Sequence, residues 1–472
     1  MRYISKYSWV KYNYGFGERR RELFREPWMG GIVLLVGVII AMIVANVPDL
    51  AVIYHKILST DTSMIIQSKN GGLDLVFPRG MTVETFINDG LMVIFFFGVG
   101  LEIKRELSKG GELSSRDRAI LPAIAALGGM VVPALIYTSL NAGTFGAGGW
   151  GIPTATDIAF AIGIISLLGD RVPLSLKVFL TALAIVDDLG AILVIALFYG
   201  GAIKLNYLAM AIVLMIFMYV INRLGERRGI WYGIPAILIW GLFYYSGVHA
   251  TLSGVIVALL IPSKPRYTKQ YFIHKSENLE QRLRDMLKDG YKLDEHGNHS
   301  EDKFREEMRE MYSLSRGSID MSHRVERVLA PYITFFIMPI FALANAGVTI
   351  NLEYLNIFAH HAQEGYIGLG VFLGLVVGKP LGITLFSYLA VKFKIAAMPE
   401  GGTWPMLIAV ACFGGIGFTM SLFVDSLAFG GVSETFVNQG KIAILLSSLS
   451  ATLLGILLVN IFHKREKKEC LK

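Results

Sequence analysis

The chain consists of long apolar runs separated by polar segments. A run of about 20 apolar residues can cross a bilayer as a helix, and backbone groups within lipid need the internal hydrogen bonds that a helix supplies. The pattern predicts an all-α integral membrane protein with about twelve transmembrane helices, whose approximate limits are Gly30–Asn46, Phe86–Gly100, Ile120–Leu140, Ile152–Leu168, Leu174–Tyr199, Leu208–Asn222, Trp231–Ser246, Ala250–Ile261, Val328–Ile350, Gly368–Ala390, Pro405–Phe423 and Ile442–Phe462. The fourth and eighth runs are short for a full crossing.

Composition supports this class of protein. The chain is 54% hydrophobic and 17% charged, whereas soluble domains carry about 25% charged residues. The runs do not alternate apolar with polar residues, which excludes a membrane β-barrel. The net charge of +7 does not indicate a nucleic-acid partner, because most basic residues flank apolar runs and anchor them at the bilayer surface. Cys412 lies in an apolar run and Cys470 in the basic tail, so we expect no disulfide.

The distribution of basic residues predicts the orientation in the membrane. Lysine and arginine gather in the first 29 residues and after each even-numbered run, whereas the loops 141–150 and 351–366 contain none. The positive-inside rule therefore places both termini in the cytoplasm. The first run has no small-residue cleavage site after it, and we interpret it as a retained helix rather than a signal peptide.

This orientation divides the chain into five parts: a cytoplasmic amino-terminal segment (1–29), eight spans (30–262, with an external loop at 49–85), a cytoplasmic insertion loop (263–327), four spans (328–462) and a basic cytoplasmic tail (463–472). The external loop contains a strand-like stretch near 71–77. In the insertion loop, residues 277–289 have the apolar spacing of an exposed amphipathic helix. We interpret that loop as a solvated insertion rather than a ligand-binding domain.

Charged residues inside the predicted spans are the strongest functional signal. Asp187 and Asp188 lie near the middle of the fifth run, Asp157 in the fourth and Lys379 in the tenth. Charge in the membrane interior is costly and usually marks an ion or proton pathway. Two adjacent buried carboxylates cannot both stay ionised without a counter-charge.

Either a proton or a small hard cation can neutralise such an acid pair, and the two compete. This competition is sufficient for cation–proton exchange. Sodium prefers oxygen ligands, which the two carboxylates, the hydroxyls of Thr156 and Thr181, and free carbonyls can supply. The structural alternative is that one aspartate simply pairs with Lys379. In the functional interpretation, Lys379 is both the partner of an aspartate and a proton carrier.

Glycine and proline interrupt two of the runs. Gly151 and Pro153 precede Asp157, and the eleventh run contains Phe413-Gly-Gly-Ile-Gly-Phe-Thr-Met420. Such breaks are tolerated at membrane depth where they line a cavity. Matching breaks in spans three to five and ten to twelve indicate inverted-topology repeats. We expect Asp157 to offset positive helix ends and Lys379 negative ones, a structural-electrostatic role that we favour over direct cation binding by Asp157.

Five motifs together resemble those of the NhaA-type sodium/proton antiporters. They are Pro153-Thr-Ala-Thr-Asp-Ile-Ala-Phe-Ala161, Ala184-Ile-Val-Asp-Asp-Leu-Gly-Ala191, Ser246-Gly-Val-His-Ala-Thr-Leu-Ser-Gly254, Phe341-Ala-Leu-Ala-Asn-Ala-Gly347 and Gly378-Lys-Pro-Leu-Gly382. The resemblance runs from about Gly30 to Phe462 and excludes most of the two long loops. It implies a bacterial inner-membrane transporter, not an enzyme and without a cofactor, in which discontinuous spans four and eleven cross mid-membrane.

The resemblance also implies roles for individual residues. Asp188 is the main sodium (or lithium) ligand and proton site, and Asp187 pairs with Lys379 and joins the exchange. Asp157 and Lys379 compensate the ends of the crossed helices. More than one proton enters per sodium ion expelled, so that transport is electrogenic. A homodimer is implied, formed partly through the 49–85 loop.

Members of this family are activated at alkaline pH, for sodium and pH homeostasis. Glu102, Arg105 and Glu326 match the region at the cytoplasmic mouth that carries this response, and His249 matches a histidine tied to it. A lone histidine is more often a packed or capping residue. The sequence departs from the pattern at Arg327 and Ala330, where the best-known members of the family carry histidines, and its insertion loop is longer than the family's usual loop.

Two other classes of protein use buried charge in the membrane. An intramembrane aspartyl protease needs Tyr-Asp and Gly-x-Gly-Asp on facing helices, but the only comparable Gly-Asp dipeptide, Gly169-Asp170, lies at the end of a run. A proton-translocating subunit of a membrane complex relies on isolated lysines and glutamates rather than adjacent aspartates. A passive channel would need a continuous polar pore, and no repeated ring of polar residues is present.

Overall fold

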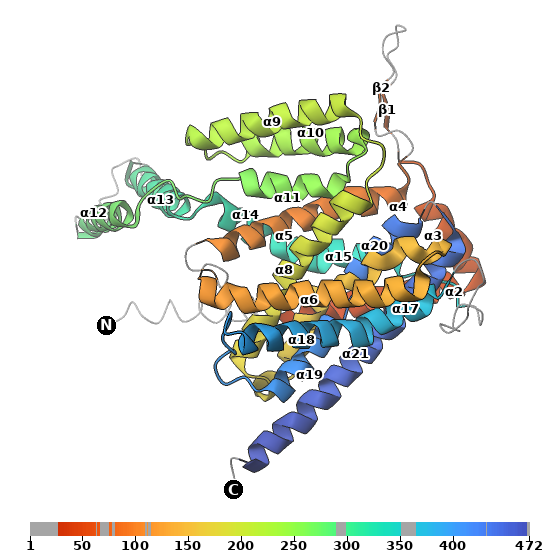
Figure 1. Ribbon diagram of the computed structural model, residues 1–472. Coiled ribbons are helices and arrows are strands. Elements are labelled where there is room, and N and C mark those ends of the chain that lie inside the picture. The colour runs from red at the N-terminus through yellow and green to blue at the C-terminus, as the bar shows by residue number, and fades with distance from the viewer. Residues whose placement is uncertain are drawn as a thin grey trace.

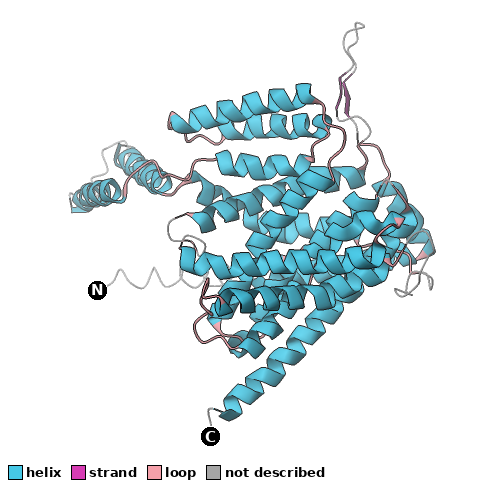
Figure 2. Cartoon of the chain, in the orientation of Figure 1, coloured by secondary structure: helices cyan, strands magenta, loops and turns pink. Residues whose placement is uncertain are grey.

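The protein is a bundle of helices with one short β ribbon in the computed structural model (Figures 1 and 2). The structure describes residues 27–62, 64–66, 75–77, 81–108, 111, 115–288, 299–350, 365–430 and 432–469. Most of the amino-terminal segment and the tail residue Cys470 lie outside the described residues, as do parts of both long loops. Cys412 is buried and is not in a disulfide.

Within the described residues, eight helices are long and apolar enough to cross a membrane. They are Pro27–Asn46 (α2), Val83–Leu107 (α4, η1 and α5), Arg116–Asn141 (α6), Leu174–Phe198 (α8), Leu205–Arg223 (α9), Met321–Asn345 (α14, η5 and α15), Ile367–Lys392 (α17, η6 and α18) and Glu434–Glu469 (α21). Two bent helix pairs raise the number to ten if each pair is one span. Two shorter apolar helices, α10 (Ile230–Ser246) and α11 (Ala250–Leu260), fall where the seventh and eighth spans were expected.

Three of the long helices contain a π-helical turn, in which the chain is locally wider than an α-helix. Such turns are rare and often lie near functional sites. The segments are, in order, α4 (Val83–Thr85), η1 (Phe86–Leu91) and α5 (Met92–Leu107); α14 (Met321–Tyr332), η5 (Ile333–Ile337) and α15 (Met338–Asn345); and α17 (Ile367–Leu373), η6 (Gly374–Gly378) and α18 (Lys379–Lys392). The third π turn ends immediately before Lys379.

Two predicted span limits were wrong in a way that matters for the buried charges. The eleventh span was expected to end at Phe423 and the twelfth to begin at Ile442. The helices instead extend to Phe429 (α20, Phe418–Phe429) and start at Glu434 (α21). Asp425 and Lys441 therefore lie within helices and are buried, although the apolar pattern assigned both to the connecting loop.

The two hydrophilic segments contain more regular structure than expected. In the external segment, α3 (Pro48–Leu58) is followed by an antiparallel ribbon of β1 (Met64–Ile66) and β2 (Leu75–Phe77). In the insertion loop, α12 (Lys269–Lys288) contains most of the helix expected at 277–289, and a second helix, α13 (His299–Ser318), was not expected.

The helices α12 and α13 pack side by side and project from one end of the bundle (Figure 1). Arg282 of α12 donates hydrogen bonds to Glu307 at 3.0 Å and Glu310 at 2.9 Å, and Leu279 is buried between the helices. Hydrogen bonds from Lys275 and Arg282 lower the pKa of the Glu310 carboxyl. The contacts hold this hairpin together as a small unit outside the spans.

Close helix packing and an apolar outer surface are the features expected of a membrane bundle. In the interior, α11 packs along α5 and α18 along α6. At the edge, α9 leaves most of its apolar side chains exposed; Met210 is 58% and Val213 65% exposed. A continuous exposed apolar surface of this kind suits contact with lipid rather than water.

The packing of α6 against α18 depends on two facing glycines. A Cβ atom added at Gly128 would collide with the carbonyl oxygen of Gly382, and one added at Gly382 would collide with the carbonyl of Gly128. Small residues at helix contacts allow backbones to approach closely in membrane proteins. These two positions set the distance between α6 and the helix that carries Lys379.

We therefore predict that Gly382→Ala lowers the melting temperature of the purified protein, at a cost of about 1–3 kcal/mol from overpacking. Gly233→Ala in α10 is the control, because nothing lies within 4 Å of a Cβ added there. A Gly382→Ala protein that melts at or above the temperature of the unmodified protein would contradict this account of the contact.

Candidate functional site

Two bent helix pairs touch each other at their bends. The 3-10 helix η3 (Phe145–Thr154) leads into α7 (Ile158–Leu167) at 43°, and α19 (Trp404–Gly414) leads into α20 at 46°. The backbone N–H of Asp157, between the first pair, donates to the carbonyl of Ile416, between the second, at 2.7 Å. Gly415, in the second break, permits close approach to a third span, because a Cβ atom there would collide with the carbonyl of Leu375 in η6.

Asp157 caps the amino ends of two helices at once. Its Oδ1 accepts a hydrogen bond from the backbone N–H of Phe160 in α7, at 3.0 Å. Its Oδ2 accepts from both the backbone N–H, at 3.1 Å, and the hydroxyl, at 2.5 Å, of Thr419 in α20. Each helix amino end carries about half a positive charge, so the two ends together offset this buried carboxylate, which is 1% exposed.

Lys379 compensates the partial negative charge at a helix carboxyl end. Its buried ammonium donates hydrogen bonds to the carbonyl of Thr154, the last residue of η3, at 2.7 Å, and to Oδ2 of Asp187, at 2.6 Å. Both charged side chains have no exposed surface. A buried charge requires such compensation, because its removal from water costs several kcal/mol.

Thr156 links the acid pair to the second break. Its hydroxyl lies 2.5 Å from Oδ2 of Asp187 and 2.9 Å from the carbonyl oxygen of Gly414, the last residue of α19. A hydroxyl has one proton to donate, so Thr156 can serve only one of these acceptors at a time. With Asp187 ionised, the charged oxygen is the stronger acceptor. Protonation of Asp187, or a cation at that oxygen, frees the hydroxyl to donate to Gly414.

Asp188 differs from its neighbour in having no hydrogen-bond or ion-pair partner among the described residues. Neither carboxyl oxygen has a hydrogen bond from any described residue, although the side chain is 1% exposed. It lines a cavity of about 770 Å³ that also reaches Asp157, Thr419, Glu102 and Glu326. This space, called here the Asp188 cavity, connects an uncompensated buried carboxyl to the mouth of the bundle.

A cluster of charges surrounds the mouth of the Asp188 cavity. Arg105 forms ion pairs with Glu326, with Glu106 at 2.8 Å and with Glu102 at 3.6 Å. His323 lies 3.8 Å from Glu326 and also lines the cavity. The structure thus brings together three of the predicted pH-response residues, Glu102, Arg105 and Glu326.

Two predicted residues lie away from this site. His249 precedes α11, and its Nδ1 lies 3.9 Å from a carboxyl oxygen of Asp89. Asp89 comes just before the amino end of α5, whereas Glu102 lies near the carboxyl end of that helix. The hydroxyl of Thr181 donates to the carbonyl of Lys177 at 3.0 Å. Thr181 precedes Asp188 by seven residues, which is ~10 Å along a helix, so Thr156 is the hydroxyl that the fold places beside the acid pair.

Sequence reasoning missed three residues of the site: Thr419, Glu106 and His323. Thr419 lies in the Phe413–Met420 motif, but the motif was used only for its glycines. Glu106 is next to Arg105 in a basic and acidic segment that offered no preference among its members. His323 was overlooked because histidines were expected at positions 327 and 330; it lies about one turn earlier on α14.

Buried, compensated charges at the junction of bent helices, in a multi-pass integral membrane protein, define the class of ion-transporting membrane proteins. Comparison with known proteins identifies the family. The chain belongs to the Na+/H+ antiporter 1 family, whose sequence model matches residues 21–459.

Curated relatives match over nearly the whole chain. The Na(+)/H(+) antiporter NhaA of Escherichia coli (strain K12) is 40% identical over 433 residues, which are 92% of this chain and 95% of that protein. The Na(+)/H(+) antiporter NhaA of Vibrio vulnificus (strain YJ016) is 40% identical over 442 residues, 93% of this chain and 95% of that protein. The resemblance that the motifs indicated is therefore confirmed.

The double cap on Asp157 gives a first prediction for the site. Asp157→Ala removes the acceptor for both helix ends and lowers the melting temperature, since each lost cap costs about 0.5–2 kcal/mol. Asp157→Asn keeps an acceptor oxygen and loses less. Equal melting temperatures for the alanine and asparagine variants would show that the side chain does not cap both helices.

The Lys379 contacts give a second prediction. Lys379→Ala leaves Asp187 and the carbonyl of Thr154 without their shared donor, and breaking a buried pair in this way costs about 3–5 kcal/mol. We expect a large fall in the melting temperature. Lys392→Ala, at the exposed end of the same helix, is the control and should change it little. An unchanged melting temperature for Lys379→Ala would argue against the pairing.

Proposed function

We propose that the protein is an electrogenic antiporter that expels sodium or lithium ions in exchange for protons, is activated at alkaline pH, and serves sodium and pH homeostasis. The observation that carries this proposal is the isolation of Asp188. A buried carboxyl without a hydrogen bond or ion pair is stable when it carries a proton or when a cation lies against it. Its position on an open cavity gives both of them access.

Asp188 is the proposed primary cation ligand and proton site. Asp187 is a second ligand, released when Lys379 gives up its contact, and Thr156 supplies a hydroxyl oxygen beside it. Carbonyls freed at the two bends add further oxygen ligands of the kind that hard cations prefer. Asp157 remains capped by two helix ends and compensates charge without binding the cation.

The electrogenic part of the proposal follows from the number of groups that titrate together. Sodium displaces one proton from Asp188. When sodium also takes the place of the Lys379 ammonium at Asp187, Lys379 releases a second proton. Two protons then enter for each sodium ion that leaves, one net charge crosses the membrane, and the membrane potential contributes to the driving force.

The proposed topology has twelve spans with both termini in the cytoplasm of a bacterial cell, in its inner membrane. Each bent pair is taken as one interrupted span, and the short helices α10 and α11 complete the count. Spans three to five and ten to twelve then form inverted repeats, since each trio has a bent pair between two long helices. The proposed domain limits are those expected from the sequence, 1–29, 30–262, 263–327, 328–462 and 463–472, although the helix of the ninth span already begins at Met321.

Regulation by pH is assigned to the mouth cluster of Glu102, Arg105 and Glu326, with His249 as a further candidate at the other end of α5. Any change of charge in this cluster alters the field at the entrance of the Asp188 cavity. The proposed homodimer forms through the 49–85 segment, which projects as the β1–β2 ribbon (Figure 1).

The alternative of an intramembrane aspartyl protease is not favoured. Such an enzyme would need Asp170 beside the Asp187–Asp188 pair, but Asp170 is exposed in η4 (Gly169–Arg171).

The decisive experiment measures sodium-driven proton movement in proteoliposomes and proton release by the purified protein when sodium is added. Asp188→Asn should abolish both, since an amide neither binds a proton in this range nor carries the charge that attracts sodium. Asp170→Asn is the matched control and should behave like the unmodified protein. Exchange that persists in Asp188→Asn, or sodium addition that releases no proton at any alkaline pH, would overturn the proposed function.

A further inference from the structure

A second buried acid, Asp425, lies outside the site described above. Its side chain has no exposed surface, and neither carboxyl oxygen has a hydrogen bond from any described residue. The carboxyl packs against Gly440 of α21 so closely that a Cβ atom at Gly440 would collide with it. Like Asp188, it is a buried carboxyl that its surroundings leave uncompensated by direct contact.

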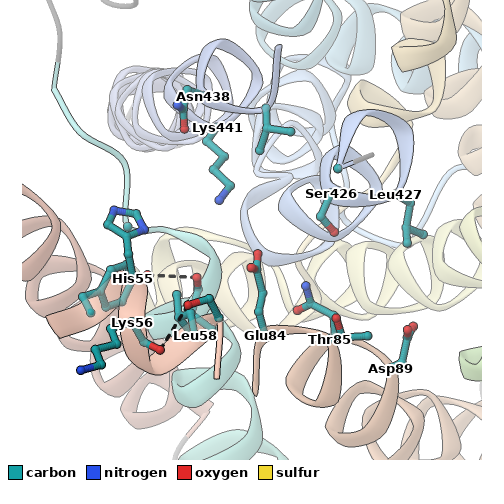
Figure 3. A pocket seen from close by; sticks show the side chains of 17 residues that line it. His55, Lys56, Leu58, Glu84, Thr85, Asp89, Ser426, Leu427, Asn438 and Lys441 are labelled. Carbon is teal, nitrogen blue, oxygen red and sulfur yellow. Dashed lines mark hydrogen bonds between the residues drawn. The ribbon is translucent and has the colours of Figure 1, made fainter. Parts of the chain in front are cut away.

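Asp425 does not itself line a cavity wall, but the next residue in the chain, Ser426, lines a second cavity. This cavity has a volume of about 910 Å³, and its lining includes Lys441 of α21, Ser426 of α20 and Glu84 of α4. We call it the Lys441 cavity. Figure 3 shows the side chains of Lys441 and Glu84 pointing into it toward one another. The chain neighbour of Asp425 and the chain neighbour of Gly440 both line this space.

The two cavities lie toward opposite ends of the bundle. The Lys441 cavity reaches Asp89, before α5, whereas the Asp188 cavity reaches Glu102, near the end of α5. Thirteen residues separate these positions, which is ~20 Å along a helix. The helix α20 also contributes to both cavities, because Thr419 lines one and Ser426 the other. Asp425 is six residues, or ~9 Å, beyond Thr419.

Few titratable groups face Asp425. Among the described residues, α20 packs mainly against η3 and α15, which carry no titratable side chain, and against α21. Phe96 of α5 and the titratable His249 also contact α20, through the ring of Phe423. Lys441 of α21 attracts Asp425 electrostatically without forming an ion pair, and Glu84 acts in turn on Lys441. The phenols of Tyr137 and Tyr199 also face the carboxyl, but their hydroxyls donate to the carbonyls of Gly146 and Gly148.

We propose that Asp425 is a second proton-binding carboxyl of the transport path, which receives its proton from the Lys441 cavity and whose proton affinity is set by Lys441. The proposal rests on the proposed function, since it adds a station to the same path. A proton from water in the cavity neutralises the carboxylate, and its release restores the negative charge beside Lys441. A purely structural Asp425 would instead hold α20 to α21.

The test is exchange in proteoliposomes with the pH of each face varied separately. Asp425→Asn keeps the shape of the side chain and should weaken the apparent proton affinity about tenfold at the face on which the Lys441 cavity opens. The dependence on pH at the opposite face should not change. Lys441→Gln removes the nearby positive charge and should strengthen the affinity at the same face about tenfold, because a charge–charge attraction is lost.

The double variant decides between the two roles. If Lys441 acts through Asp425, Asp425→Asn combined with Lys441→Gln has the profile of Asp425→Asn alone. Ser426→Ala controls for changes in the cavity wall. An infrared band of a protonated carboxyl that is present in the unmodified protein and absent from Asp425→Asn provides a readout that does not need transport.

Three results would overturn the proposal: an unchanged pH profile of Asp425→Asn, an equal shift at both faces, or a fall in maximal rate alone. If Asp425→Asn does not fold, a Lys441→Gln profile identical to that of the unmodified protein would also refute it. These outcomes are separate from failure of the proposed function, which requires Asp188→Asn to retain sodium-driven proton movement.

Discussion

The cost of placing charge where water is absent governs the arrangement of this molecule. An ion removed from water loses several kcal/mol of solvation unless hydrogen bonds or an opposite charge replace it. The bent helices meet this requirement, because each bend exposes unpaired backbone groups with a partial charge. Asp157 is compensated by two helix amino ends and Lys379 by one carboxyl end and Asp187. The bends are therefore what compensates these two charges in the interior.

The two adjacent aspartates show how little separation is needed to create different environments. Successive side chains on an α-helix point about 100° apart. As a result, Asp187 meets Lys379 on α18 whereas Asp188 turns toward the Asp188 cavity. One carboxyl has a fixed counter-charge and the other has none, so that they need not titrate alike. Neither composition nor spacing could distinguish the two aspartates; the proposal of Asp188 as the primary ligand came from the family resemblance.

The sequence was most informative where the signal is local. Long apolar runs predicted the long helices, and glycine and proline marked the segments where the chain bends. Contacts between distant segments could not be predicted in this way. Thr419 follows Asp157 by 262 positions, and only the fold brings its hydroxyl to that carboxyl. Likewise Thr156 and Thr181 offer the same hydroxyl, and the helix geometry alone selects the first.

The span limits failed for a related reason. Hydrophobic pattern assigns a charged residue between two apolar runs to a loop, so Asp425 and Lys441 were not considered among the buried charges. In the structure each helix continues past its apolar run, and Gly440 makes room there for the Asp425 carboxyl. The signal that could have indicated the longer helices is the pair Gly440-Lys441, which stands across the predicted loop from Asp425.

The way in which each charge is compensated distinguishes charges that stay from charges that move. Two helix amino ends supply about one positive charge, so Asp157 is balanced whether or not a cation is present. Lys379 receives about half a negative charge from the end of η3 and the remainder from Asp187. In the proposed exchange, a proton or a cation that neutralises Asp187 leaves only this half charge beside Lys379. Occupancy of the acid pair would then change the compensation of Lys379 but not that of Asp157, although both lie at the same crossing of helices.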